Sequence, residues 1–211
     1  MAIPRDRWTP PLPPERSRPE RVPGAMGGSL LWEQPAQAAD RARLEAFVQP
    51  GPPVGLEIGF DHGMRLLAMA RAWPEWRWLG VELRRRRVEA VVPLAPDNCL
   101  PLRADARTLL ATLLPPGRLS RVDILFPTPA TDARRLLLSA ELVADLARAL
   151  GPEGVVHIET DVPAMGELAE RLFAGWDVVE APFGVADLSR RQRVARRDGL
   201  QVWVISRGRP A

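Results

Sequence analysis

A regular alternation of apolar strand-like segments with helix-like segments, which begins at Val54, constrains the fold of this chain more than any other feature. The apolar runs predict strands at 55–60, 76–82, 99–104, 122–126, 155–160, 176–181 and 201–206. Between the first six strands, apolar residues recur at helical spacing and predict helices at 64–73, 84–92, 107–114, 134–150 and 164–173. Such alternation is typical of an α/β fold, here a doubly wound, mainly parallel sheet of seven strands with right-handed crossovers. No helix is predicted between the last two strands, so we expect them to form an antiparallel pair at one edge.

The N-terminal segment differs in composition from this alternating region. Residues 1–24 contain seven prolines among charged side chains, and proline fits neither a helix interior nor a sheet ladder. We therefore expect residues 1–28 to be a disordered tail rich in proline and arginine. Residues 29–211 are expected to form one domain, which starts with a short amphipathic helix within 29–49.

The composition also limits the cellular setting. No apolar run reaches the ~18 residues that a membrane span needs, and Cys99 is the single cysteine. One cysteine cannot form an internal disulfide and fits the reducing cytoplasm, where we expect the protein to act. We expect no metal site, because His62 and His157 fall in unrelated motifs.

Positive charge is concentrated near the C-terminal end. All 29 basic residues are arginine, which points to codon bias, so their number alone says little about a partner. Their placement is more informative, because residues 184–211 hold seven arginines and two aspartates, a net charge of +5. A localised basic segment suits an anionic partner such as nucleic acid, although a solvated basic tail has the same composition.

Acidic residues follow three successive predicted strands. The first strand ends in Glu57-Ile58-Gly59 and continues through a second glycine into a helix, a turn that lets the backbone approach a ligand closely. Glu82 ends the second strand, where a carboxylate accepts hydrogen bonds from a ribose diol. Asp105 follows the third strand and is placed to accept from an adenine amino group. One ligand that contains adenosine would satisfy all three positions.

Two adenosine ligands compete for this site, a dinucleotide and S-adenosylmethionine. The turn lacks the Gly-x-Gly-x-x-Gly pattern that cradles a pyrophosphate. In addition, Glu57 would repel a phosphate but suits a sulfonium or ammonium group. The residues therefore favour S-adenosylmethionine.

Several motifs resemble those of the bacterial tRNA (guanine-N7)-methyltransferases. Residues 56–83, LEIGFDHGMRLLAMARAWPEWRWLGVEL, are similar to the family's opening Leu-Glu-Ile-Gly-Phe-Gly-x-Gly and its later Gly-(Val/Ile)-Glu. Asn98 precedes Asp105 by seven residues, as in the family's Asn-Leu-(x)5-Asp-Ala. ILFPTPA and VVHIETD resemble Phe-Pro-Asp-Pro-Trp and Gly-x-x-His-x-x-Thr-Asp, and Ser189 begins a faint match to Thr-Lys-Phe-Glu.

The resemblance implies a Rossmann-like S-adenosylmethionine-dependent methyltransferase that modifies guanine N7 in tRNA. Position by position, it assigns cofactor binding to Glu57, Gly59, Glu82, Asn98 and Asp105. Asp161 would face the guanine, as would Thr128 if the family's aspartate stood there. The resemblance assigns contacts with the RNA to Arg134, Arg135, Ser189, Arg190, Arg191 and Gln192.

The departures from the family cluster on the expected substrate side. Thr128 replaces the aspartate between the two prolines, and Ala130 replaces the tryptophan that follows them. Asp61 replaces the middle glycine of the first motif and must tolerate a positive φ, which aspartate does only in part. The basic insert before the fourth helix is about four residues shorter than in the family.

These departures leave three functional hypotheses. The first is methyl transfer to guanine N7 of tRNA, for which Thr128 is not needed as a base, because N7 carries a free lone pair. The second is a methyltransferase of the same fold that acts on another RNA or on a small molecule. The third is a catalytically silent RNA-binding relative that keeps the cofactor fold as a scaffold.

Overall fold

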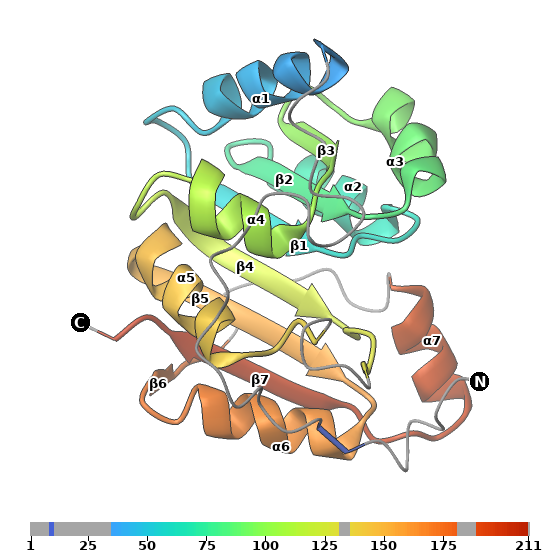
Figure 1. Cartoon of the computed structure of the whole chain (residues 1–211). Helices are drawn as coiled ribbons and strands as arrows, with labels where there is room; N and C mark the ends of the chain where they lie inside the picture. The colour runs from blue at the N-terminus through green and yellow to red at the C-terminus, as the bar shows by residue number, and fades with distance from the viewer. Residues whose placement is uncertain (1–8, 11–34, 131–135, 181–188, 211) are drawn as a thin grey trace.

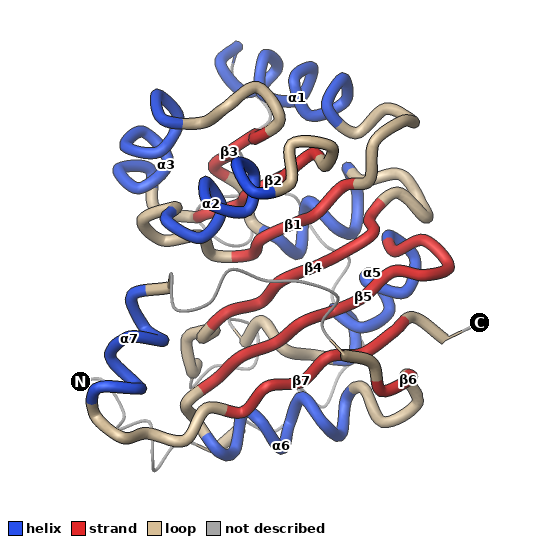
Figure 2. The backbone as a smooth tube through the Cα atoms, turned by 180° about the vertical axis from the view of Figure 1, so that it is seen from behind, coloured by secondary structure: helices blue, strands red, loops and turns tan. Residues whose placement is uncertain are grey.

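The computed structural model describes residues 9–10, 35–130, 136–180 and 189–210. Its centre is a seven-stranded sheet in the order β3-β2-β1-β4-β5-β7-β6 (Figures 1 and 2). The strands are β1 Val54–Ile58, β2 Arg77–Glu82, β3 Cys99–Arg103, β4 Leu119–Leu125, β5 Leu150–Thr160, β6 Asp177–Val178 and β7 Trp203–Gly208. The first five are parallel, while β7 runs antiparallel to both β5 and β6. The predicted doubly wound sheet with an antiparallel edge pair is confirmed.

Helices lie on both faces of the sheet. In Figure 1, α4 and α5 lie in front of it, whereas Figure 2 shows α2 in front from the opposite side. The helical segments are α1 Pro35–Phe47, α2 Met64–Ala72, α3 Arg85–Val91, η3 Val92–Leu94, α4 Ala106–Thr108, η4 Leu109–Leu113, α5 Ala140–Ala149, α6 Pro163–Leu172 and α7 Arg190–Arg197. Within the part of the chain that the structure describes, no helix is long and apolar enough to cross a bilayer.

The central strands are buried on both faces, as expected for a covered parallel sheet. All five residues of β1 are buried, and Leu56 and Ile58 belong to the larger of two apolar clusters. A smaller cluster between the sheet and α2 contains Phe60, Leu66 and Trp78. Burial of these strands fixes their register, which in turn fixes where their carboxyl ends stand.

Some predicted element bounds change. The helix predicted at 134–150 begins at Ala140, because the Ser139 side chain caps it by accepting from the Leu142 backbone N–H. The last predicted segment before the C-terminal strand, 176–181, is a strand only at Asp177–Val178. Residues 131–135, like most of the predicted tail, lie outside the described residues. The domain division at residue 28 therefore stays a prediction.

The structure also contains a helix that the apolar pattern does not predict. Helix α7 is formed by RRQRVARR and starts at a capping box. The Ser189 hydroxyl accepts from the Gln192 N–H, and the Gln192 side chain accepts from the Ser189 N–H. This local pairing satisfies two backbone donors that a short polar helix would otherwise leave open.

Candidate active site

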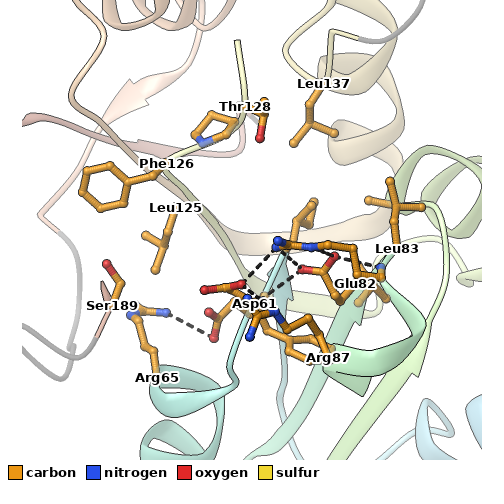
Figure 3. A pocket seen from close by; sticks show the side chains of 18 of the residues that line it. Asp61, Arg65, Glu82, Leu83, Arg87, Leu125, Phe126, Thr128, Leu137 and Ser189 are labelled. Carbon is orange, nitrogen blue, oxygen red and sulfur yellow. Dashed lines mark hydrogen bonds and ion pairs between the residues drawn. The ribbon is translucent and has the colours of Figure 1, made fainter. Parts of the chain in front are cut away.

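A cavity of about 680 Å³ opens at the carboxyl ends of the parallel strands. It is lined by residues from the ends of β1, β2, β3 and β4 and by the beginning of α7. Figure 3 shows side chains gathered around one space, with Thr128 and Leu137 on one side and Asp61 and Glu82 on the other. Ligands of open α/β sheets bind outside the carboxyl strand ends, so this is the expected place for a site.

The turn after β1 brings the backbone to the cavity. Gly59 has φ of 78°, and a Cβ added there would meet no atom within 4 Å, which leaves the backbone open to a ligand. Gly63, with φ of 70°, stands just before α2, and its missing side chain makes room for Val91. Between them, Asp61 has φ of 48°, the left-handed conformation expected at this position because Asp61 replaces a glycine of the family's motif.

Glu82 is held in place by its own neighbours. Its carboxylate accepts from the Asp61 N–H at 3.2 Å, from the Arg84 N–H at 3.0 Å and from Arg84 Nε at 3.1 Å. Arg84 also donates to Asp61 at 3.0 Å, so one arginine links two acids at the rim. These bonds orient a carboxylate that is itself buried.

Asp105 is oriented in a similar way at the end of β3. It caps α4 and accepts from the Arg107 N–H at 2.9 Å, while the Arg107 guanidinium binds the same carboxylate at 2.6 Å. Both residues line the cavity. The structure therefore brings Glu57, Gly59, Glu82 and Asp105 together around one space, as the sequence predicts.

Glu57 is a buried carboxyl of the cavity with a raised pKa. It is 4% exposed, and its Oε2 has no hydrogen-bond partner. Burial raises the pKa of Glu57 from 4.5 to about 7, although the nearby charge of Arg65 acts in the opposite direction. A buried carboxyl of this kind is stabilised in its charged form by a cation that enters the cavity.

A buried ion-pair network lies next to Glu57. Arg65 on α2 donates to Asp123 on β4 at 2.9 Å, and Arg121 donates to the same carboxylate at 2.9 Å. Burial alone would raise the pKa of Asp123, but the two arginines hold it below its ordinary value. The sequence analysis overlooks these residues, although Asp123 interrupts an apolar strand in register with Glu57.

The corner at Pro127-Thr128-Pro129 forms part of the cavity wall. Phe126 adopts φ of 49°, which is strained for a bulky side chain, and its N–H donates to the Glu159 carbonyl at 2.7 Å. Pro127 is buried, whereas Thr128 is exposed and lines the cavity beside Leu125. A rigid, strained corner thus presents Thr128 to the space where a methyl acceptor would lie.

Asp161 follows β5 and is not among the residues that line the cavity. Its side chain is fully buried at the end of β5 and forms an ion pair with Arg191 of α7. Arg191 lines the cavity and Asp161 does not, so the arginine lies closer to the space than the carboxylate. The Asp161 carboxylate therefore contacts α7 and does not face the cavity.

Asn98 is remote from the cavity, which corrects the expectation that it binds the cofactor. Its side-chain amide donates to the carbonyls of Ala70 at 2.8 Å and Trp76 at 3.0 Å. The residue directly precedes β3, whereas Asp105 follows this strand. A five-residue strand spans about 17 Å, so Asn98 and Asp105 lie at opposite ends of β3.

The predicted RNA contacts divide into two groups. Ser189, Arg190 and Arg191 line the cavity mouth at the start of α7. Gln192 instead points to the sheet, where its amide donates to the buried carboxylate of Glu159. Arg134 and Arg135 lie outside the described residues.

Comparisons with known proteins identify the family of this chain. A family model described as a putative methyltransferase matches residues 52–178, or 127 of the 211 residues. The tRNA (guanine-N(7)-)-methyltransferase of Synechococcus sp. (strain JA-2-3B'a(2-13)) is 36% identical over 162 residues, which cover 72% of this chain and 67% of the relative. The protein of the same name from Synechococcus sp. (strain JA-3-3Ab) is 40% identical, over 56% of this chain and 52% of the relative.

A solved structure supports the fold. The crystal structure of the 16S rRNA methyltransferase KamB superimposes with a TM-score of 0.61 at 20% identity, covering 81% of this chain and 94% of that chain. This similarity concerns the fold alone, while the sequence matches identify the family. The chain spans between about half and two thirds of the length of the two curated relatives. Together with the family model, they show that the chain belongs to the tRNA (guanine-N(7)-)-methyltransferase family.

Proposed function

We propose that this protein transfers the methyl group of S-adenosylmethionine to N7 of a guanine in tRNA. The observation that carries the proposal is the placement of Glu57, Glu82 and Asp105 at the carboxyl ends of three adjacent parallel strands, around one cavity with an open glycine turn. The names of the curated relatives supply the substrate. The basic start of α7 at the cavity mouth suits a polyanionic partner.

The residues present fit the proposed cofactor. The buried Glu57 Oε2 lacks a hydrogen-bond partner and suits the amino group of the methionine part. The open space at Gly59 allows a ligand to contact the backbone, and Glu82 offers a carboxylate to a ribose diol. Asp105, at the end of the next strand, is placed for the adenine amino group. When bound, the cofactor supplies an electrophilic methyl group on a sulfonium centre.

The role of the protein in this reaction is mainly alignment. Guanine N7 has a lone pair outside the Watson–Crick edge and loses no proton before it attacks, so no general base is required. The wall formed by Leu125, Pro127 and Thr128 would hold the base against the cofactor side of the cavity. Fixing two reactants in a productive geometry is itself a large source of rate enhancement.

A second candidate is a methyltransferase of the same fold with another RNA or a small molecule as substrate. Two observations support this second candidate. Thr128 offers no charge where the family's pattern has an aspartate, and the Asp161 carboxylate is paired with Arg191. Both features lie on the side of the cavity that would recognise the base, whereas Glu57, Glu82 and Asp105 are present on the cofactor side.

Nucleoside analysis of tRNA tests the proposal directly. tRNA from cells that lack this gene should lose 7-methylguanosine at the modified position, and the purified protein should restore it with S-adenosylmethionine. Restoration by wild-type protein and not by Glu82→Ala would support the proposed function. Binding of cofactor without any methylation of tRNA would favour the second candidate. Absence of cofactor binding would favour a silent RNA-binding relative.

A further inference from the structure

A row of buried polar side chains crosses the sheet from the cavity to β7. Glu57 on β1 pairs in register with Asp123 on β4, Asp123 with His157 on β5, and His157 with Ser206 on β7. All four are buried. Because side chains alternate between the faces of a strand, directly paired residues lie on the same face. Only the Glu57 end of this row reaches the cavity.

One arginine connects the cavity end of this row to its interior. Arg65, from the first turn of α2, is 4% exposed and lies against both carboxylates. Its Nη1 is 2.9 Å from Asp123 Oδ2 and 3.9 Å from Glu57 Oε2. Asp123 has a second arginine, Arg121, whose Nε donates at 2.9 Å, whereas Glu57 forms its ion pair among the described residues with Arg65.

Loss of Arg65 and loss of Arg121 should therefore affect the two carboxylates differently. A carboxylate that leaves water loses solvation and becomes neutral unless a nearby cation compensates. Asp123 retains one partner if either arginine is lost. Glu57 would lose its ion pair with Arg65, and its Oε2 has no hydrogen bond to replace it.

We propose that Arg65 is a positioning residue, which favours the charged form of the Glu57 carboxylate so that it can bind the amino group of the methyl donor. The inference rests on the proposed function, because it assumes a ligand with a cationic amino group in this cavity. Arg65 acts through Glu57 and is not itself assigned to the reacting atoms. Its anchor is Asp123, which is held from the other side by Arg121.

Other charged groups around Glu57 act in both directions. Asp123 opposes ionisation of Glu57, and Arg121 favours it more weakly than Arg65 does. On β5, His157 and Glu159 hydrogen-bond to each other at 3.0 Å, and the charge of Glu159 also acts on Arg65. On β3, Cys99 is buried, and burial raises the pKa of its thiol to about 12, so it stays neutral.

The test is the pH dependence of binding of S-adenosylhomocysteine, measured by calorimetry on the full chain between about pH 5.5 and 8.5. Wild-type affinity should fall as pH drops through about 7, where Glu57 takes up a proton. In Arg65→Met the midpoint should move to higher pH, and each unit of this shift weakens binding about tenfold on the acidic side. Arg121→Met, an equally buried change at the same anchor, is the matched control and should move the midpoint less.

Two further variants separate a charge effect from a packing effect. In a Glu57→Gln background, Arg65→Met should no longer change the pH midpoint, because the group that titrates is absent. If Arg65→Met does not fold, Arg65→Lys and Arg65→Gln replace it, and affinity at pH 7 should follow the retained charge of lysine.

The outcomes distinguish this inference from the function on which it rests. No binding by the wild-type protein would contradict the proposed cofactor site itself. Wild-type binding with a midpoint that Arg65→Met shifts no further than Arg121→Met would overturn only the role of Arg65. An effect of Arg65→Met that persists in the Glu57→Gln background, or equal affinities of the lysine and glutamine variants, would overturn it as well.

Discussion

At the scale of single residues, two acids of the site, Glu82 and Asp105, are held in place by hydrogen bonds from neighbouring residues. Glu82 accepts four hydrogen bonds, two from the backbone N–H groups of Asp61 and Arg84 and two from the Arg84 guanidinium, so its carboxylate points in a fixed direction. Asp105 is fixed by Arg107 in the same manner. Such groups need little reorganisation when a ligand binds, which reduces the entropic cost of association.

Replacement of Glu82 should therefore weaken cofactor binding in a measurable way. We expect Glu82→Ala to reduce the affinity for S-adenosylhomocysteine by about 1–3 kcal/mol, the usual effect of losing a charged hydrogen-bond acceptor. Calorimetry gives the difference. Glu89→Ala, which removes an exposed carboxylate on α3, is the control and should bind like the wild type. Equal affinities for Glu82→Ala and the control would place the ribose elsewhere.

Thr128 tests which substrate the cavity accepts. If the acceptor is guanine, Thr128→Asp should restore a charged contact to the base edge and raise tRNA methylation. A gain of about 1.5–3 kcal/mol is the upper limit, which corresponds to about one to two orders of magnitude in rate. Steady-state methylation of tRNA measures it. If the cavity suits another substrate, the new carboxylate should lower activity, whereas stability should change little because Thr128 is exposed.

Thr128→Ala is the matched variant for this experiment. Thr128 is exposed at the cavity wall, so removal of its hydroxyl should cost little stability and little activity. A loss of turnover greater than about a hundredfold, with the fold intact, corresponds to nearly 3 kcal/mol of transition-state stabilisation. That result would show that the hydroxyl takes part in the chemistry.

At the scale of secondary structure elements, α7 links the sheet to the cavity mouth. Its inner side is attached by the Arg191–Asp161 ion pair and by the Gln192–Glu159 hydrogen bond. Arg190 and Arg193 are exposed on the same helix. The helix is therefore divided between residues that attach it and residues that face solvent.

We expect the exposed arginines of α7 to contact RNA phosphates. In that case log K for tRNA falls linearly with log salt, and Arg190→Gln with Arg193→Gln should reduce this slope by up to about two contacts. Filter binding over a salt series measures the slope. The paired control is Arg41→Gln with Arg43→Gln, two exposed arginines of α1. An unchanged slope in the α7 double variant would show that tRNA binds another surface.

The strands could be predicted because their apolar runs are buried in a parallel sheet. The predicted strand ends also indicated that Glu57, Glu82 and Asp105 lie close together, as they do around the cavity. Helix α7 was missed because only Val194 and Ala195 of its eight residues are apolar. Its stability comes from the capping box and from contacts with β5, of which only the Ser-x-x-Gln spacing is visible in the sequence. Asn98 was assigned to the cavity through the family resemblance alone, although the strand predicted at 99–104 already separates it from Asp105.

The charged network was missed for a related reason. Asp123 and Arg121 alternate with apolar residues along β4, a pattern that usually indicates one solvent-exposed face. Here Arg65 comes from a helix that packs over this face and buries both side chains. Compensation between charges from distant segments appears only once the elements are assembled.

At the scale of the whole molecule, the buried Glu57 should make stability depend on pH. Its pKa is about 7 in the folded protein and 4.5 by the ordinary value, so the folded state holds a proton that the unfolded state has released. Stability due to this group therefore falls as pH rises between these two values and levels off above about 7. The loss approaches about 3 kcal/mol at pH 8 for a shift of this size.

Glu57→Gln should remove this loss. We expect the variant to be more stable than the wild type at pH 8, with a smaller difference at pH 5.5. Urea denaturation at both pH values measures the free energy of unfolding. Asp123→Asn should have the opposite effect at pH 8, because it leaves two buried arginines without their carboxylate. A Glu57→Gln variant that is less stable than the wild type at pH 8 would contradict the assignment.

The strand order has a consequence for how the chain avoids misassembly while it folds. Strand β6 precedes β7 in the sequence, and among the described strands it pairs with β7 alone, so β5 remains an open sheet edge until residues 203–208 are added. Open edges invite pairing with other chains, and natural proteins discourage this with charged side chains that point inward. His157 and Glu159 are such residues on β5. The polar row that crosses the finished sheet would thus also act as a safeguard against aggregation before the sheet is complete.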